Sequence, residues 1–209
     1  MVNVGAMMKL HQHPFSTFSR RVRIALLEKK IDVELVEVDI VARAHKAEPY
    51  VSLNPYGRVP TLVDDDLVLY ESTAILEYLE AKYPGPVALV PPDIRQRALV
   101  SMNMKLCDLQ LTRQAGVIIF AKRFVPEASW RREEMAKASK EIGRHFAILD
   151  RELAGKAYLV AEKYTLADLC YVPFLEFLPL MEVEVPANVK AWSERLLSRP
   201  SSVATKPAR

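Results

Sequence analysis

The first 84 residues alternate between short apolar runs and amphipathic helical patterns, whereas the rest of the chain shows helical patterns only. Met8–Gln12 and Val33–Val38 are typical of strands, and the segment between them, Ser19–Lys30, has apolar residues at the spacing of one helix face. A strand, a helix and a strand with connections this short predict a βαβ unit, with parallel pairing and a right-handed crossover.

A hairpin and a third helix complete this part of the chain. After a polar, irregular segment at residues 42–53, the β-rich runs Thr61–Val63 and Leu67–Tyr70 flank a turn of consecutive aspartates. Ser72 is placed to cap a helix over Ser72–Tyr83, which ends at the Pro-Gly-Pro segment 84–86. This order of elements predicts a thioredoxin-like α/β domain over residues 1–84, followed by a proline-containing linker.

Residues 93–209 show no strand pattern and predict an all-α bundle as a second domain. The periodicity predicts one long helix over 93–124, a second over 130–153 and a last one over 187–197, and the tail beyond is expected to be mobile. A further helix begins at Thr165, where Thr165 and Asp168 form a variant capping box with reciprocal side-chain to backbone bonds.

Composition indicates an ordinary globular protein of 209 residues with a net charge of +3. Lys and Arg are spread along the chain, which predicts solvated helix faces, and the clusters at 20–23 and 131–132 are too short to indicate a nucleic-acid partner. No apolar run is long enough to cross a bilayer, and residues 1–10 lack the features of a signal peptide. We therefore expect a cytoplasmic location, with no nucleic-acid or membrane partner.

The cysteines and histidines do not predict a metal site. Cys107 and Cys170 lie far apart in helical patterns and are expected to be buried free thiols. His11 and His13 alternate along the first strand, but no third ligand falls at zinc spacing.

We expect the chemistry at the turn between the first strand and the first helix. Such a turn aims unpaired backbone N–H groups and the positive end of a helix at one point, so that a sulfur or phosphate anion is stabilised there. Ser16 lies at this point. Taken alone, a serine after a strand is most simply a helix N-cap. The position of a redox Cys-x-x-Cys pair holds Ser16 and Ser19 instead, which excludes a dithiol oxidoreductase.

Three motifs in this order resemble those of the cytosolic glutathione S-transferases: Gln12–Val22, Asn54–Leu62 and Leu69–Ile75. With the linker and the capping box, the resemblance covers nearly the whole chain. Among the classes of this family, the chain is most similar to the phi class. The Ser-x-x-Thr-Arg-Arg-Val segment of that class corresponds to Ser16 to Val22, with Ser19 in place of Thr. The resemblance implies the glutathione S-transferase fold and glutathione transferase activity on apolar electrophiles, with glutathione as co-substrate and no metal.

The resemblance implies that Ser16 is the catalytic residue and donates its hydroxyl to the glutathione thiolate. No tyrosine precedes Tyr50 and no cysteine precedes Cys107, so tyrosine-based and cysteine-based transferase mechanisms have no candidate here. Lowering a thiol pKa from about 8.5 to about 6.5 needs roughly 2.7 kcal/mol. One charge-assisted hydrogen bond of about 1.5 to 3 kcal/mol and a helix end of about 0.3 to 2 kcal/mol can supply it.

Glutathione-binding residues are implied in the same way. Val59-Pro60 resembles the cis-proline turn that leaves the Val59 backbone free to pair with the peptide, and a proline at the start of a strand is the competing interpretation. Glu71 and Ser72 resemble the pair that holds the γ-glutamyl end.

Three more residues of this predicted site are basic. Lys46 and His45 fall where phi-class enzymes bind the glycine carboxylate, although alone they would be ordinary surface residues. Arg58 stands where the phi family usually carries Gln, and it could clamp a carboxylate or point to solvent.

The electrophile is expected between the domains, against Phe15, Phe18 and Phe120, with Met104 and Leu111 on the same helix pattern as Phe120. Core packing is the competing interpretation for any one of these residues.

Tyr56 resembles the aromatic residue that family dimers insert into a partner subunit, so a homodimer is expected.

Two other functions stay open. One is a non-catalytic interaction protein on the same fold, similar to the stringent starvation proteins, which would be expected to lose the glutathione-binding residues. The other is a glutathione-dependent isomerase, whose Ser-Ser-Cys turn is not matched by Ser16-Thr17-Phe18. The balance between transferase and peroxidase activity does not follow from the sequence.

Overall fold

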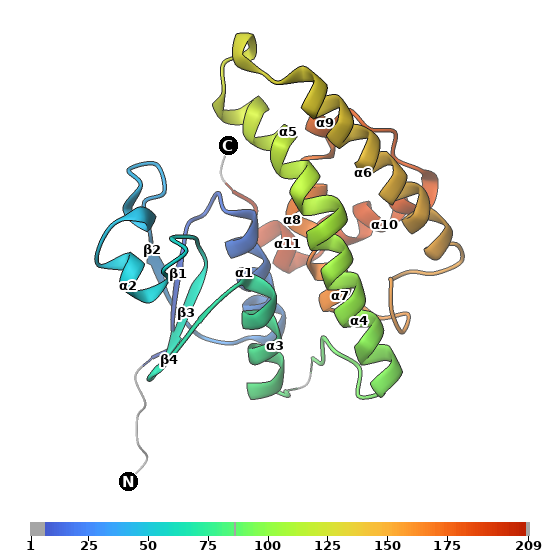
Figure 1. The fold of residues 1–209 in the computed structure, drawn as a ribbon. Coiled ribbons are helices and arrows are strands. Elements are labelled where there is room, and N and C mark those ends of the chain that lie inside the picture. Colours follow the sequence, from blue (N-terminus) through green and yellow to red (C-terminus); the bar gives the residue numbers. More distant parts are fainter. Residues whose placement is uncertain (1–6, 86, 208–209) are drawn as a thin grey trace. The chain divides into compact units, whose positions relative to one another are not determined.

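The structure is a computed structural model that describes residues 7–85 and 87–207 (Figure 1). It divides into two compact units. The first contains the described residues up to Ala88 together with those from Val203, and the second is Leu89–Ser202. The sequence-based division placed all of 93–209 in the second domain, whereas the described residues from Val203 belong to the first unit. Thr205 explains part of this difference, because it is buried and its hydroxyl accepts from Arg20 Nε at 3.3 Å.

The first unit contains a four-stranded mixed sheet of order β2-β1-β3-β4. Its strands are β1 (Lys9–Gln12), β2 (Glu34–Glu37), β3 (Thr61–Asp64) and β4 (Leu67–Tyr70). Leu10 of β1 lies opposite Leu35 in the parallel pair with β2 and opposite Leu62 in the antiparallel pair with β3. The predicted βαβ unit, hairpin and thioredoxin-like α/β fold are therefore confirmed.

Helices cover both faces of this sheet. Figure 1 shows α1 (Thr17–Lys29) and α3 (Ser72–Lys82) on one side and the short α2 (Tyr50–Leu53) on the other. With the 3-10 turn η1 (Ala44–Lys46), α2 gives regular structure to the segment expected to be irregular. The core under α1 and α3 consists of Met8, Leu10, Val22, Leu26, Leu62, Ile75 and Leu79. Burial of each such aliphatic side chain stabilises the fold by about 1.5–3 kcal/mol, so this core fixes both helices on the sheet.

A polar contact ties the end of β3 to the end of α3. The buried Asp64 carboxylate accepts hydrogen bonds from Tyr78 and Lys82. Burial raises the pKa of Asp64, but the hydrogen bonds from Lys82 and Tyr78 and the Lys82 charge outweigh this and lower the pKa overall. This contact holds the C-terminal end of the helix that begins at Ser72.

The second unit is all helical, as predicted. Figure 1 shows its two longest helical runs side by side: α4 (Ile94–Leu106), η2 (Cys107–Thr112) and α5 (Arg113–Phe124) form one, and α6 (Arg132–Glu152) the other, with the 3-10 turn η3 (Glu127–Ser129) between them. The middle segment of the first run is a π-helix, which the periodicity did not predict. The Cys107 thiol donates to the Cys170 carbonyl at 3.4 Å, and both cysteines are buried and not joined in a disulfide.

The remaining helices are short: α7 (Leu166–Leu169), α8 (Val172–Leu175), α9 (Leu178–Met181), α10 (Ala187–Leu197) and α11 (Pro200–Ala204). Pro173 and Pro179 lie in the first turns of α8 and α9, where a proline begins a new helix and cannot continue the preceding one. The tail expected to be mobile instead forms α11, with Ser201 and Ser202 buried.

Asp168 accepts four hydrogen bonds inside the second unit. The predicted capping box with Thr165 is present. One oxygen of this fully buried side chain accepts from the Thr165 N–H at 3.0 Å and the Thr165 hydroxyl at 3.1 Å. The other accepts from the Leu159 N–H at 3.0 Å and from Trp192 Nε1 at 2.9 Å. Asp168 thus joins the start of α7 to a loop and to α10.

Candidate functional site

Ser16 is the N-cap of α1, in extended conformation and half-buried. Its Oγ accepts from the Ser19 N–H at 3.1 Å, and its own N–H donates to the His13 carbonyl at 3.0 Å. A hydroxyl has one donor and two acceptor positions, and capping uses an acceptor. The cap and the donation of a proton to a ligand are therefore compatible roles rather than alternatives.

A small pocket of about 50 Å³ brings many of the other predicted residues together. It is lined by Phe18, Asn54, Arg58, Val59, Pro60, Glu71 and Ser72. The Val59–Pro60 peptide bond is cis, as the resemblance implied. Within the part of the chain that the structure describes, the backbone N–H and C=O of Val59 make no hydrogen bond. They are thus available to an extended peptide, which could pair with them as a strand does.

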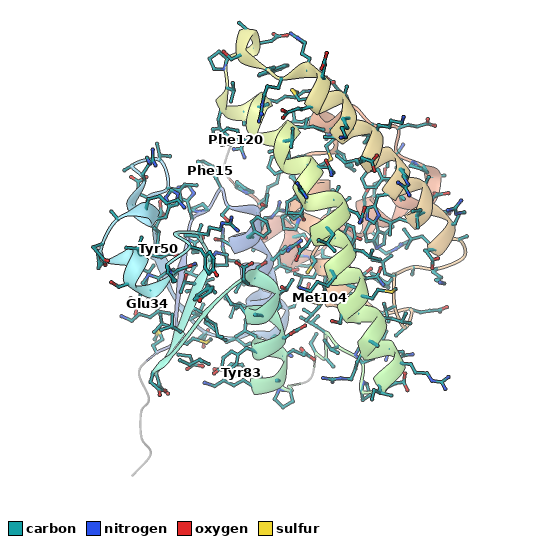
Figure 2. All side chains as sticks on the ribbon, in the orientation of Figure 1. Phe15, Glu34, Tyr50, Tyr83, Met104 and Phe120 are labelled. Carbon is teal, nitrogen blue, oxygen red and sulfur yellow. The ribbon has the colours of Figure 1, made fainter. Side chains whose placement is uncertain are left out.

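The turn before Val59 is held through the carbonyl of Arg58. That carbonyl accepts from the Tyr50 hydroxyl at 2.6 Å and from Asn54 Nδ2 at 2.8 Å; Tyr50 is labelled in Figure 2. Burial raises the pKa of Tyr50, so its hydroxyl stays a donor near neutral pH. The Arg58 side chain is exposed at the pocket, where a planar guanidinium can reach a carboxylate.

The basic pair His45 and Lys46 lies on η1 and packs against the same turn. Lys46 Nζ donates to the Tyr56 carbonyl at 3.0 Å. Gly57 has a φ of +55°, and a Cβ on it would come 2.6 Å from the His45 carbonyl, so this close approach requires glycine. Burial, Lys46, Arg43 and then His13 lower the pKa of His45. The side chains of Lys46, Arg43 and His13 thus surround the His45 imidazole with basic groups. Such a surface favours the binding of an anion.

Glu71 and Ser72 occupy a strained start of α3. Glu71, not Ser72, is the N-cap, with φ 71° and ψ 113°, and its side chain makes no capping bond. The prediction that Ser72 caps this helix was wrong, because Ser72 is already its first helical residue. The Ser72 side chain is buried and the Glu71 side chain is exposed. Strain of this kind, at a residue that is not glycine, is typical of functional sites.

Arg21 is a residue of this site that the sequence analysis missed. Arg20 and Arg21 are both buried, with 2% and 0% of their surfaces exposed, rather than part of a solvated face. Arg21 Nη1 lies 3.3 Å from Ser72 Oγ. Helical spacing was the available signal, because residue 21 shares a face with positions 24 and 25, which are buried in α1.

The residues predicted for the electrophile are divided between the two units. Phe15 and Phe18 are exposed in the first unit, and Phe15 packs on the His13 ring at 5.4 Å; Figure 2 labels Phe15 and, on α5, Phe120. Phe120 is an exposed residue of the second unit that packs on Phe124. Met104 and Leu111, which were predicted on the same helix pattern as Phe120, are buried in the core of the second unit.

Tyr56 is 63% exposed and packs on Tyr70, with 5.7 Å between the ring centroids.

A larger pocket of about 560 Å³ in the second unit was not predicted. Apolar residues of α4 and α6 line it, among them Met102, Leu106 and Ile148. His145 also lines it, and Nε2 of His145 lies 3.1 Å from the Tyr171 hydroxyl. Burial lowers the pKa of His145 to about 4, so this imidazole is neutral at pH 7.

In residues 7–85 and 87–207 no group of His, Cys, Asp and Glu could hold a metal ion. No helix in those same ranges has the length and apolar character needed to cross a membrane.

A thioredoxin-like unit with a cis-proline turn, followed in the chain by an all-helical unit, defines the class of glutathione-transferase folds. Residues 10–87 match the glutathione S-transferase N-terminal domain, and residues 114–200 match the glutathione S-transferase C-terminal domain. The chain therefore belongs to the glutathione S-transferase family, as its motifs implied.

Individual relatives agree with this assignment. The chain is 32% identical to glutathione S-transferase APIC of Nicotiana tabacum, over 93% of this chain and 95% of that protein. The structure of glutathione transferase F7 from Populus trichocarpa matches with a TM-score of 0.88 at 32% identity, over 95% of this chain and 97% of the other, in agreement with the phi-like class. A stringent starvation protein A homolog of Coxiella burnetii is 33% identical over 87% of this chain and 80% of its own length.

Proposed function

We propose that this glutathione transferase binds glutathione in its first unit and that Ser16 holds the thiol as a thiolate for attack on an apolar electrophile. The observation that carries the proposal is the geometry of Ser16. Its Oγ accepts from the Ser19 N–H at the start of a 13-residue helix, so its O–H proton is available to a sulfur anion at the positive helix end. An activated thiolate attacks by proximity and nucleophilicity, with no metal required.

The remaining residues offer a partner for each part of glutathione. We propose that Lys46 and His45 attract the glycine carboxylate and that the Val59 backbone pairs with the cysteinyl residue. Glu71 and Ser72 would then hold the γ-glutamyl end. The Arg58 side chain, exposed at the same pocket, is assigned to a glutathione carboxylate.

A pH titration of the ultraviolet thiolate absorbance of bound glutathione tests this function. A free thiol ionises near about pH 8.5, and we expect the bound thiol to ionise near about pH 6.5. Because the pKa of the bound thiol is lowered, the thiolate signal should be present at neutral pH and be lost as the pH falls below 6.5. If glutathione binds but its thiol pKa is unchanged, Ser16 acts only as a helix cap.

The alternative of a non-catalytic interaction protein has one observation in its favour, the 33% identity to the stringent starvation protein A homolog. The retained Ser16, the available Val59 backbone and the Glu71-Ser72 pair favour ligand binding instead. Failure of glutathione to bind in the titration would reverse this preference.

For the electrophile we propose an apolar surface that includes the exposed Phe15 and Phe18, of which Phe18 lines the small pocket, and Phe120 stays a prediction. Isomerase and peroxidase activities and a cytoplasmic location also stay predictions.

We also propose a homodimer in which Tyr56 of one copy inserts into the α4–α6 pocket of the other. An exposed aromatic side chain and a pocket of about 560 Å³ whose lining includes apolar residues of α4 and α6 are a suitable pair for such a contact. Tyr56→Ala should shift sedimentation at micromolar concentration from dimer to monomer. Phe124→Ala, which also removes an exposed aromatic, is the control and should stay dimeric. A monomeric parent protein contradicts the proposal.

A further inference from the structure

Provided that the pocket binds glutathione as proposed above, we infer that Arg21 is a positioning residue that acts through Ser72. Its buried guanidinium orients the Ser72 hydroxyl toward the α-carboxylate of the γ-glutamyl residue. Arg21 thereby sets the preference of the site for a ligand that carries this carboxylate.

The first observation is the placement of the charge. Arg21 is fully buried in α1, and its Nη1 lies 3.3 Å from Oγ of Ser72, the first residue of α3. Its guanidinium carbon lies 5.3 Å from the centroid of the Phe18 ring, one turn earlier on α1. Phe18 and Ser72 both line the small pocket. A permanent positive charge is therefore held directly behind the polar end of this pocket.

The second observation concerns the direction of the Ser72 proton. A guanidinium is a donor with no acceptor, so in this contact Oγ of Ser72 must act as the acceptor. The hydroxyl has one proton, and that proton must point away from Arg21. Because the Ser72 side chain lines the pocket, a ligand oxygen there can receive it. Polarisation by the buried cation makes this hydroxyl a stronger donor to an anion.

The third observation is that the opposite charge stands beside this donor. Glu71 is exposed at the same pocket, immediately before Ser72. A carboxylate at this position repels a ligand carboxylate but attracts a ligand ammonium group. Arg21 with Ser72, and Glu71 next to them, thus match the two charges of an α-amino acid end group. A simple carboxylate would satisfy only half of this arrangement.

Binding measurements with two ligands test the inference by calorimetry. One ligand is glutathione, and the other is 4-aminobutyryl-Cys-Gly, which lacks only the α-carboxylate of the γ-glutamyl residue. The parent protein should bind glutathione about 10- to 100-fold more tightly, the range expected for one hydrogen bond to a charged group. In Arg21→Met this ratio should fall to a few-fold. A purely structural role of Arg21 would weaken both ligands equally and leave the ratio unchanged, which would overturn the inference.

Arg20→Met is the matched control. Arg20 is also buried on the same helix, and its Nε donates to the Thr205 hydroxyl at 3.3 Å. The variant Arg20→Met should lower the stability of the protein, while the ratio of the two ligand affinities stays at the parent value. Arg21→Lys keeps the buried charge and tests the inference if Arg21→Met does not fold. We expect an intermediate ratio for it, and a parent-like ratio would count against a role of the guanidinium.

A double-mutant cycle tests whether Arg21 acts through Ser72. In a Ser72→Ala background, Arg21→Met should change the ratio less than about twofold. A change as large as in the parent background overturns the route through Ser72. The outcomes also separate this inference from the proposed function. If the parent does not bind glutathione, both fail; if it binds and lowers the thiol pKa but Arg21→Met keeps the parent ratio, only the inference fails.

Discussion

Replacing Ser16 with alanine is expected to lower kcat by at least about 25-fold at pH 7 while the affinity for glutathione falls only about fourfold, the loss that the raised pKa of the bound thiol itself causes at this pH. If the bound thiol ionises at about 6.5 in the parent and about 8.5 in the variant, the thiolate fraction at pH 7 falls by about 25-fold. Loss of the fixed sulfur position lowers the rate further. Most of the affinity is retained because it comes from the carboxylate and peptide contacts, which the substitution leaves in place.

The pH dependence separates loss of activation from loss of structure. Because the parent pKa is the lower one, the part of the deficit caused by ionisation should shrink to less than about twofold at pH 9, where both thiols are ionised. Loss of the α1 cap costs about 1 kcal/mol of stability at every pH. Thr17→Ala removes the neighbouring hydroxyl and should keep parent kinetics. An equal deficit in Thr17→Ala, or a deficit in Ser16→Ala that does not change with pH, would contradict the assignment.

Replacing Asp168 with alanine is expected to lower the free energy of unfolding by about 3–5 kcal/mol. Four donors converge on this fully buried carboxylate, and truncation leaves the buried Trp192 Nε1 and Thr165 groups without an acceptor. Asp168→Asn should be nearly as destabilising despite its equal shape. Each Asp168 oxygen receives two donors, so an amide NH₂ in either position faces donors.

Urea denaturation of each variant measures the effect, with Asp150→Ala as the control. Asp150 accepts through its side chain from the Asn188 N–H at 2.8 Å and is only half-buried, so its loss should cost about 1 kcal/mol. Equal midpoints for the Asp168 and Asp150 variants would show that the capping box is not a major source of stability.

The elements that the sequence predicted well are those defined by nearby residues. The capping box joins Thr165 and Asp168, which are three positions apart, and the hairpin follows from β-rich runs on both sides of a short turn. The burial of Arg21 was not predicted although it shares a helix face with positions 24 and 25, and its contact with Ser72, 51 positions away in the chain, has no local signal. Composition alone favours solvent for such a charge.

The candidate site was predictable as a set of residues but not as a geometry. The sequence named Val59, Pro60, Glu71 and Ser72, and the structure shows that they line one pocket. The positive φ of Glu71 has no local signal, since glycine would be the expected residue at such an angle. It depends on how β4 and α3 are joined, which the packing of the whole first unit determines.

The return of the residues from Val203 to the first unit makes that unit discontinuous in the chain. A contiguous fragment that contains it must also contain the second unit, and a cut at the linker would separate Arg20 from Thr205, whose side chains meet across 185 positions. Exchange of the N-terminal segment between two relatives would likewise pair one protein's α1 with the other's tail. Chimeras made from this chain therefore need both ends from the same parent.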